Sequence, residues 1–550
     1  MLVYGDRART IDPRRRLAEL DRLLAAADPS PDVITHALIA AGELAQGIAD
    51  AEVERLGCDD VTALQSAAME LPRAIAGRAY VGTGAGDCAT ALAALAAMPL
   101  PARLRCKQGE GFAFYAVYPE CYAAAAAAHH WGAPPLAIGL RSIGTTLAAT
   151  VAAVTGGRAI SLRPRGHPFR RRALASDRLR AELAAHRGPF AIVDEGPGLS
   201  GSSFGSIADL LEELGVTQDR IVFMPSHQGP LGPEASARHR KRWEGARRLT
   251  RTLDDVLADD PIERWFADAI GPAVAQDISA GAWRHGMREP RPPMAPSFER
   301  RKLRLRSARG EFVARFAGLG AIGEEKLARA RALHDAGFGP EPLALRRGFL
   351  LERWVIGEPL DPLRDRRALL DHLGKYLGFR ARNFPAAVED GAGADLLRRM
   401  AIVNTTELCG PTVGARVAER LERLASGAPV HVDGRLHGWE WRRTDCGLCK
   451  LDALDHSCGH DLVGAQDIAW DAAGAAVEFA LRDEETAELA RLLEVDATSV
   501  NALAICYAAF QGGLWTMASQ QRPPAEAACR REKVAVYRGE IGRRTVSAAR

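Results

Sequence analysis

Hydrophobic residues recur at different spacings along the chain, and each spacing predicts a different kind of element. Up to about residue 104 they fall mainly at helical intervals, as at Leu17 and Leu24, which predicts a helical N-terminal region. Short apolar runs without polar positions follow, and such runs are typical of buried strands. They lie at residues 135–140, 190–193 and 220–224. An Ala-rich helical pattern follows the first run, and an amphipathic one follows the second.

The pattern changes again in the second half of the chain. A helix-rich stretch leads from about residue 251 to a proline-rich segment at 289–296, which we interpret as a domain boundary. Beyond it, residues 303–306 and 312–316 predict a hairpin around Gly310. A helix, a strand at 348–354 and a mostly helical remainder follow. The predicted units are therefore 1–104, 105–250, a linker at 251–296, and 297–550.

Composition narrows the function classes. A chain of 550 residues is too long for one core, and 47% apolar and 26% charged residues are typical of a soluble globular protein. A net charge of +3 favours neither nucleic acid nor an anionic membrane as partner. Ten cysteines without a regular framework, and no apolar signal core, predict reduced thiols in the cytoplasm. We therefore expect a cytoplasmic protein acting on a small molecule.

An acidic pair and a loop of small residues follow the apolar run at 190–193. Asp194 and Glu195 come first, and glycines and hydroxyl residues continue to Ser203. Glycines allow a phosphate to approach the backbone, and free N–H groups at a helix N-terminus favour negative charge. The two carboxylates would repel a phosphate, so they suit the vicinal hydroxyls of a sugar, or a metal. Together these groups predict a ribose phosphate site, with an ordinary strand-to-helix turn as the alternative.

This stretch resembles the diphosphoribose-binding loop of type I phosphoribosyltransferases, in which two acids precede a Thr-Gly-x-Thr turn. Here the loop is one residue longer, and Glu195 replaces the commoner second Asp. The resemblance implies an α/β domain with a parallel sheet, in which Asp194 and Glu195 act on the ribose through an oxocarbenium-like transition state. The residues it implies for the 5-phosphate are Gly198, Ser200, Gly201, Ser202 and Ser203.

Two upstream segments extend the resemblance. The first apolar run ends in a short glycine loop, similar to the loop that holds pyrophosphate in this family, and residues 163–172 form a basic run. Phosphoribosyl diphosphate is the implied substrate, with Mg²⁺, and a homodimer is a possible assembly. The residues implied for the pyrophosphate are Arg141, Ser142, Gly144, Thr145, Arg163 and Arg165.

A second set of motifs lies in the C-terminal half, around His431-Val432-Asp433 and Lys450-Leu451-Asp452. It resembles the aminoglycoside phosphotransferase and choline kinase group, which is protein-kinase-like. The resemblance implies an α+β domain of two lobes that uses ATP and Mg²⁺ to phosphorylate a small molecule. Asp433 would be the catalytic base, Asp452 or Asp455 the metal ligand, and Asp471 a support of the loop.

Departures from this pattern leave an alternative open. The metal-binding Asn is missing, and Glu440 lies where a two-residue insertion would put it. Arg315 replaces the expected Lys, which is not a neutral exchange, and no convincing glycine-rich loop is present. We expect Arg315, Glu325 and Glu352 to contact the nucleotide. The sequence thus predicts a bifunctional enzyme, with a non-catalytic nucleotide-binding sensor or scaffold as the alternative.

Three further patterns have more than one interpretation. The glycine loop at 80–87 is a turn, a loop that serves the neighbouring transferase site, or a methyl-donor loop after a strand. The aromatic stretch 110–120 is either core or the wall of an acceptor pocket. The third pattern has the residue types of a zinc site, or of buried thiols. It comprises Cys446, Cys449, Cys458 and His460.

Overall fold

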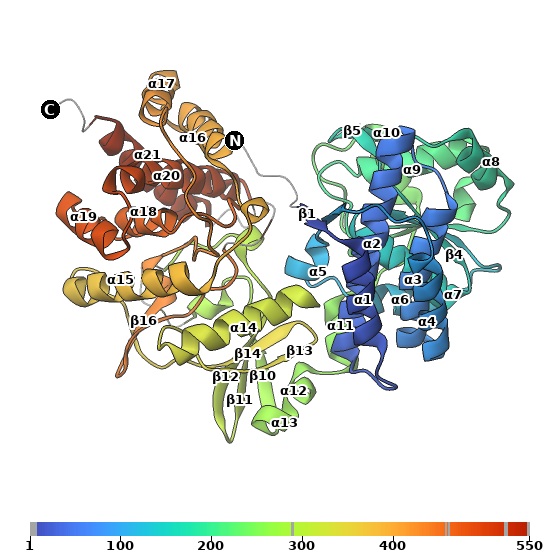
Figure 1. Ribbon diagram of the computed structural model, residues 1–550, viewed down its shortest axis with the longest axis horizontal. Coiled ribbons are helices and arrows are strands. Elements are labelled where there is room, and N and C mark those ends of the chain that lie inside the picture. Colours follow the sequence, from blue (N-terminus) through green and yellow to red (C-terminus); the bar gives the residue numbers. More distant parts are fainter. Residues whose placement is uncertain are drawn as a thin grey trace.

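The computed structural model describes residues 8–285, 287, 291–456, 459, 462–521 and 526–546. Figure 1 shows the N-terminal half, in blue and green, beside the C-terminal half, in yellow to red. The chain is a mixed α/β protein with several sheets, and each half contains one sheet of five strands.

Four helices form the N-terminal region, as the apolar spacing predicted. Leu17 and Leu24 are buried on the first of them, and Ser30 and Thr62 cap the second and third with their hydroxyls. The helices are α1 (Pro13–Leu24), α2 (Pro31–Leu56), α3 (Ala63–Tyr80) and α4 (Ala85–Ala96). Residues 81–84 join two helices, so the strand predicted before this glycine loop is wrong and the methyl-donor interpretation loses its basis.

A parallel five-stranded sheet follows, in the order β4-β3-β7-β8-β9. Its inner strands are apolar throughout because helices cover both faces. The strands are β3 (Leu136–Leu140), β4 (Arg158–Leu162), β7 (Phe190–Val193), β8 (Ile221–Met224) and β9 (Arg247–Arg248). The helices around it are α6 (Pro119–Ala127), α7 (Ile143–Thr155), α8 (Asp177–Ala185), α9 (Ser202–Glu213) and α10 (Ala237–Gly245).

The strand order creates a crevice at the edge of this sheet. The chain leaves β3 toward β4 on one side, and later returns to β7 on the other side. The loops after β3 and β7 therefore diverge, and ligands of open α/β sheets bind at such a switch point beyond the carboxyl ends of the strands. The acidic pair directly follows β7. A basic hairpin, β5 (Arg165–His167) and β6 (Arg170–Arg172), lies in the connection between β4 and β7.

The C-terminal half has a small lobe built on an antiparallel sheet, in the order β10-β11-β12-β14-β13. Its strands are β10 (Ala273–Asp277), β11 (Lys302–Ser307), β12 (Gly310–Phe316), β13 (Pro342–Arg346) and β14 (Phe349–Arg353). Helix α14 (Ala321–Asp335) connects β12 to β13. The hairpin, helix and strand predicted from the sequence are all present. Short helices α11 (Leu253–Asp259), α12 (Ile262–Trp265) and α13 (Ala267–Ile270) precede the lobe.

The second lobe is mainly helical, so the predicted two-lobed arrangement is present. Its helices are α15 (Arg366–Asn383), α16 (Ala394–Cys409), α17 (Pro411–Arg420), α18 (Ala469–Glu478), α19 (Asp483–Leu492), α20 (Ala497–Ser519) and α21 (Ala527–Val546). A small sheet contains β15 (Glu358–Pro359), β16 (Trp441–Thr444) and β17 (Gly447–Lys450). Trp470 and Tyr507 pack in the core of this lobe.

The proline-rich segment lies inside the C-terminal unit. Since β10 pairs with β11 in one sheet, the small lobe begins before residue 289, and not after the boundary that the sequence predicted. The connection between these strands also reaches the last helix of the other lobe. Arg530 donates to the carbonyl of Met294 at 2.7 Å, and Arg284 forms an ion pair of 2.8 Å with Glu526.

A short helix, α5 (Glu110–Phe114), lies at the junction of the two halves (Figure 1). The carbonyl of Phe112 accepts a hydrogen bond of 2.9 Å from the amide of Leu319 in the small lobe. Phe112 and Tyr118 share an apolar cluster with Phe316 and Phe349. The aromatic stretch is therefore a helix and a turn in a shared core. The remaining short pair is β1 (Ala8–Ile11) with β2 (Leu104–Lys107).

Within the described residues, no single helix has both the length and the apolar composition needed to cross a membrane. By these two criteria alone, the pair α19 and α20, bent by 112°, would pass, and it is the only such pair in the part of the chain that the structure describes.

Candidate functional site

A cavity of about 850 Å³ opens beyond the carboxyl ends of the parallel strands. The acidic pair and Gly198 line it from the loop after β7, Arg171 from the basic hairpin, and Tyr115 from the segment after α5. This volume is within the usual range of small-molecule pockets, about 300–1,000 Å³. The cavity could therefore admit a sugar phosphate.

Backbone hydrogen bonds hold the acidic pair in place at the end of β7. The hydroxyl of Tyr122 donates to the carbonyl of Asp194 at 2.8 Å, and the amide of Ser226 donates to the carbonyl of Glu195 at 3.1 Å. Burial raises the pKa of Asp194 to about 7, although Arg171 and Arg163 lower it. A ligand that donates hydrogen bonds or brings positive charge would favour the ionised form.

Helix α5 approaches the second acid closely. A Cβ added to Gly111 would lie 2.7 Å from Oε2 of Glu195 and 2.6 Å from Cδ1 of Ile143. A side chain at this position would push the carboxylate away, so the glycine is needed for the approach. The wall of the cavity that α5 forms is thus packed directly against the acidic pair.

The hydroxyls of the small-residue loop face the basic hairpin. The side chain of Ser202 donates to the carbonyl of Pro168 at 2.9 Å, and that of Ser200 donates to Ser202 Oγ at 3.0 Å. Gly198 and Gly201 have φ angles of 60° and 61°, which favour glycine. Of the five residues predicted to bind the 5-phosphate, Gly198 lines the cavity. Ser200 and Ser202 are buried under the hairpin.

The arginines predicted to bind pyrophosphate have partners within the protein. Arg141 is buried and its Nη1 lies 3.1 Å from Asp50, while Arg163 makes hydrogen bonds of 2.7 and 2.6 Å with the same carboxylate. Their guanidinium groups thus join the sheet to α2, and neither residue lines the cavity. Arg165 is on β5 and also does not line it.

The other residues of the loop after β3 lie at the start of α7. A Cβ on Gly144 would lie 2.5 Å from the carbonyl oxygen of Val193, so this glycine permits close packing of α7 on β7. Thr145 is fully buried. Ser142 precedes the first residue of the helix. Sequence reasoning did not single out Arg171, although its basic run was the signal that could have found it.

The second site lies around Asp433 in the C-terminal unit. Asp471 accepts hydrogen bonds from the amides of Asp433 and Gly434 at 2.7 and 2.8 Å, so it supports this loop as expected. The carboxylate of Asp433 is buried and accepts a hydrogen bond from the hydroxyl of Tyr376. Burial alone would raise the pKa of Asp433, but Lys450 and His456 hold it well below its usual range.

Two basic residues of the small lobe join this cluster. Arg315 on β12 donates to Glu352 on β14 at 2.7 Å and lies 3.2 Å from Asp455. Lys326 on α14 forms an ion pair with Asp455 as well. Glu325 lies apart, 3.6 Å from Arg9 near the junction of the two halves. Of the three predicted nucleotide contacts, the structure therefore brings together Arg315 and Glu352, and Glu325 is outside.

Three side chains in this cluster have the spacing of a metal site. The ligand atoms of Glu440, Asp452 and His456 lie within 4.8 Å of one another. However, Arg435 lies 2.8 Å from Glu440 and 3.4 Å from Asp452, and Lys450 lies 2.7 Å from Glu440. The residues present therefore do not fit a divalent cation, since basic side chains already contact two of its three potential ligands.

The space beside this cluster is small. A cavity of about 90 Å³ is lined by Phe114, Arg300 and Arg315, among others. The charged ends of Arg300 and Lys326 both lie 5.5 Å from the centre of the Phe114 ring, within the range of a cation–π contact. Helix α5 of the N-terminal half thus fills part of this space, which is far smaller than a typical small-molecule pocket, about 300–1,000 Å³.

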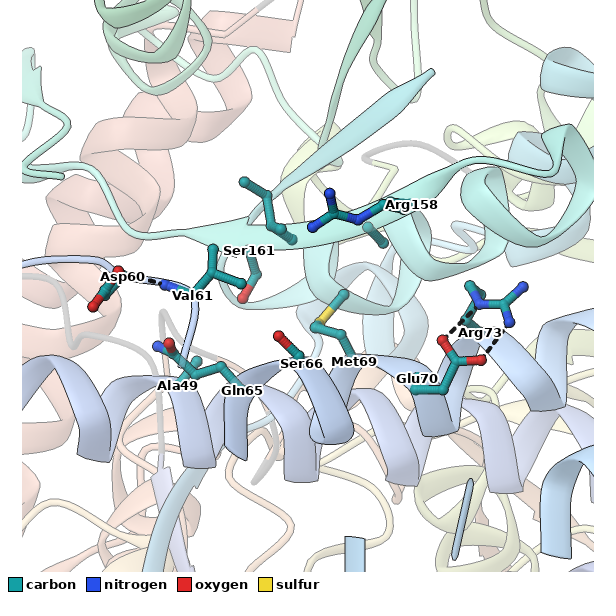
Figure 2. Close-up of a pocket in the computed structure, with 12 residues that line it drawn as sticks. Ala49, Asp60, Val61, Gln65, Ser66, Met69, Glu70, Arg73, Arg158 and Ser161 are labelled. Carbon is teal, nitrogen blue, oxygen red and sulfur yellow. Dashed lines mark hydrogen bonds and ion pairs between the residues drawn. The ribbon is translucent and has the colours of Figure 1, made fainter. Parts of the chain in front are cut away.

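Two other candidate sites, a small cavity and the predicted zinc site, have fewer reactive groups in the described residues. A cavity of about 140 Å³ lies between α3 and β4. Figure 2 shows its lining residues, among which Glu70 and Arg73 pair with each other on α3. Cys446 and Cys449 lie on the β16–β17 hairpin, and burial raises the pKa of Cys449 to about 12. The other two residues of the predicted zinc set, Cys458 and His460, lie outside the described residues.

No family model matches the sequence, and no curated protein matches it. Among solved structures, the choline kinase LicA from Streptococcus pneumoniae is 15% identical, with a TM-score of 0.30, and the match covers 44% of this chain and 89% of that one. The choline kinase from Cryptosporidium parvum Iowa II is 12% identical, with a TM-score of 0.33, over 52% and 95% of the two chains.

A spectinomycin phosphotransferase solved with ADP and spectinomycin is 11% identical, with a TM-score of 0.36, over 52% of this chain and 97% of its own. The kinase-like structures thus match about half of this chain. At these TM-scores the likeness carries no argument about activity, which has to come from the two sites themselves.

Proposed function

We propose that the N-terminal half transfers ribose phosphate from phosphoribosyl diphosphate to a small-molecule nucleophile. One observation carries this proposal: two adjacent carboxylates, at the switch point of a parallel sheet, line a cavity of about 850 Å³ that Arg171 also lines. Carboxylates suit the ribose hydroxyls, and a guanidinium suits the diphosphate.

The residues have distinct roles in this proposal. Asp194 and Glu195 accept hydrogen bonds from the ribose hydroxyls and stabilise the positive charge that develops on the sugar in the transition state. Arg171 lies on the hairpin and balances the charge of the departing diphosphate. Carboxylate oxygens are suitable ligands for Mg²⁺, which would neutralise further charge on the diphosphate.

The loop hydroxyls need one rearrangement. The hydroxyls of Ser200 and Ser202 are engaged at the carbonyl of Pro168. A phosphate bound by these two serines would replace that contact, and the β5–β6 hairpin would then move away from the loop. The hairpin is short, exposed and paired with itself alone, so such a movement disturbs no other strand.

The test is pyrophosphate release from phosphoribosyl diphosphate in the presence of Mg²⁺ and a panel of nitrogen nucleophiles. We expect Asp194→Ala to lower turnover by about 10²–10³-fold, because it removes a preorganised charge from the transition state. Glu213→Ala, which changes an exposed acid on α9, is the matched control. Unchanged turnover in Asp194→Ala would remove the assignment.

For the C-terminal half we propose a nucleotide-binding sensor or scaffold, because its acids are paired with basic side chains and its cavity is small. An active small-molecule kinase is the other possibility. Calorimetry with ATP, together with a phosphate-transfer assay on small alcohols and amines, separates the two. Binding without transfer supports the sensor, and transfer that Asp433→Asn abolishes supports the kinase.

A further inference from the structure

Arg435 occupies the place between two carboxylates where a divalent cation would bind. Its guanidinium contacts Glu440 at 2.8 Å and Asp452 at 3.4 Å. These are two of the three side chains whose spacing would suit a metal. Arg435 comes two residues after Asp433, in the part of the loop that the sequence predicted to be lengthened.

Lys450 is a second basic group at the same place. It is fully buried at the end of β17, with its ammonium 2.7 Å from Glu440 and 3.5 Å from Asp433. Lys450 also donates a hydrogen bond to the backbone carbonyl of Asp452. Each acid that could attract a metal therefore has a positive partner supplied by the chain.

The third potential ligand is also engaged. His456 lies between Asp433 and Asp452, 3.6 and 3.5 Å from their oxygens. Its two ring nitrogens therefore each face a carboxylate of the site, so a metal bound through this imidazole would have to displace one of these contacts.

We propose that Arg435 and Lys450 replace the divalent cation of this site, so that the C-terminal half binds its ligand without metal. A divalent cation at Glu440 and Asp452 would lie next to a guanidinium and an ammonium, in a buried setting where like charges repel strongly. Phosphate oxygens entering here would meet basic side chains directly, including Arg300 and Lys302, which line the same cavity.

The experiment is titration with Mn²⁺ alone, followed by the electron paramagnetic resonance signal of the free ion. The acids of the N-terminal half can also bind Mn²⁺. Binding to the C-terminal site is therefore measured as the difference in bound Mn²⁺ between a protein and the same protein carrying Glu440→Gln. We expect this difference to be zero in the wild type. In Arg435→Gln we expect one new Mn²⁺ site that depends on Glu440. Its affinity should be at least about tenfold higher than that of any residual Glu440-dependent binding in the wild type.

Controls make the outcome decisive. Arg443→Gln removes an arginine that pairs with Glu358 on the outer side of the β15–β16 sheet, and it should gain no site. The double variant Arg435→Gln/Glu440→Gln should lose the gained site. A wild-type Mn²⁺ site that Glu440→Gln abolishes would overturn the proposal, and so would a folded Arg435→Gln variant that gains none. The wild-type measurement decides the question alone if Arg435→Gln fails to fold.

Discussion

Both sites contain buried Asp and Glu side chains, but the pKa of Asp194 at the first site and that of Glu440 at the second are shifted in opposite directions. At the end of β7, burial dominates and raises the pKa of Asp194 to about 7. In the C-terminal site, burial acts in the same direction on Glu440, but Arg435 and Lys450 outweigh it and lower the pKa. At Asp194, a backbone hydrogen bond from Glu195 and the charges of Arg171 and Arg163 do not outweigh burial. Glu440, in contrast, contacts two basic side chains directly.

The cavities beside the acids of the two sites also differ, in volume and in lining residues. The cavity of about 850 Å³ at the first site has one hairpin arginine among its lining residues together with Arg251 and Arg301. The cavity of about 90 Å³ at the second site contains Arg300, Arg315 and Arg435 next to its acids. Arginines thus line both cavities, but at the second site Arg315 and Arg435 form direct ion pairs with the acids.

The largest expected effect comes from breaking the balance at the second site. Lys450→Met leaves Glu440 and Asp433 buried with less positive charge, and removing one partner of a buried ion pair typically costs about 3–5 kcal/mol. We expect the free energy of unfolding in urea to fall by about that amount. Lys375→Met, at an exposed position on α15, should change it little. A fall no larger than that of the control would contradict the pairing described here.

A smaller effect of opposite sign is expected at the first site. The folded-state pKa of Asp194, about 7, is above its unfolded value of 3.8. The folded state therefore binds more protons between these values, and its stability falls as pH rises from about 4 to 7. Asp194→Asn removes this loss, so it should raise the free energy of unfolding by on the order of 2 kcal/mol at pH 8, and hardly at pH 4.

The pH profile sharpens the comparison. At the second site, the acids whose pKa is lowered, such as Asp455 with a pKa of about 2, contribute stability that is present above their unfolded pKa and is lost only as the solution becomes strongly acidic. Between pH 5 and 8 these acids should contribute no slope, whereas Asp471, whose pKa burial and Asp433 raise to about 6, should contribute one. Asp395→Asn, at an exposed position, is the control, and a gain that does not depend on pH would speak against the raised pKa.

The smallest effect concerns the hairpin that covers the first site. Ser202→Ala removes the hydrogen bond to the carbonyl of Pro168 and should cost about 1 kcal/mol. We expect faster hydrogen exchange in residues 165–172, while Ser203→Ala, whose side chain is not part of this contact, should leave it unchanged. Equal exchange in the two variants would mean that the serine does not hold the hairpin.

The local elements were predictable because their signals are local. The apolar run at 190–193 is β7 to the residue, and the hairpin and the strand predicted after residue 302 lie close to their predicted bounds. β10 was missed, because its residues pair with β11 across a long connection. The family resemblance assigned Arg141 and Arg163 to a ligand. Their partner in the structure, Asp50, is about a hundred residues away in the sequence, so no local signal indicated it.

The candidate residues of the second site show the same limit. Asp433, Asp452 and Glu440 were identified from motif spacing, and they do meet in space. Nothing in the spacing indicated that Arg435 and Lys450 would turn toward them, since a basic residue beside a motif is usually exposed to solvent. Helix α5 beside this site was also not predictable, because it comes from the other half of the chain.

The sequence by itself determined most of the helices and strands, and which acids stand at strand ends, because these follow from the spacing of apolar residues and from loop chemistry. Only the tertiary structure decided which acids are neutralised and which remain available. That outcome depends on distances of a few ångströms between residues far apart in the chain, and the energy of a buried charge changes steeply over such distances.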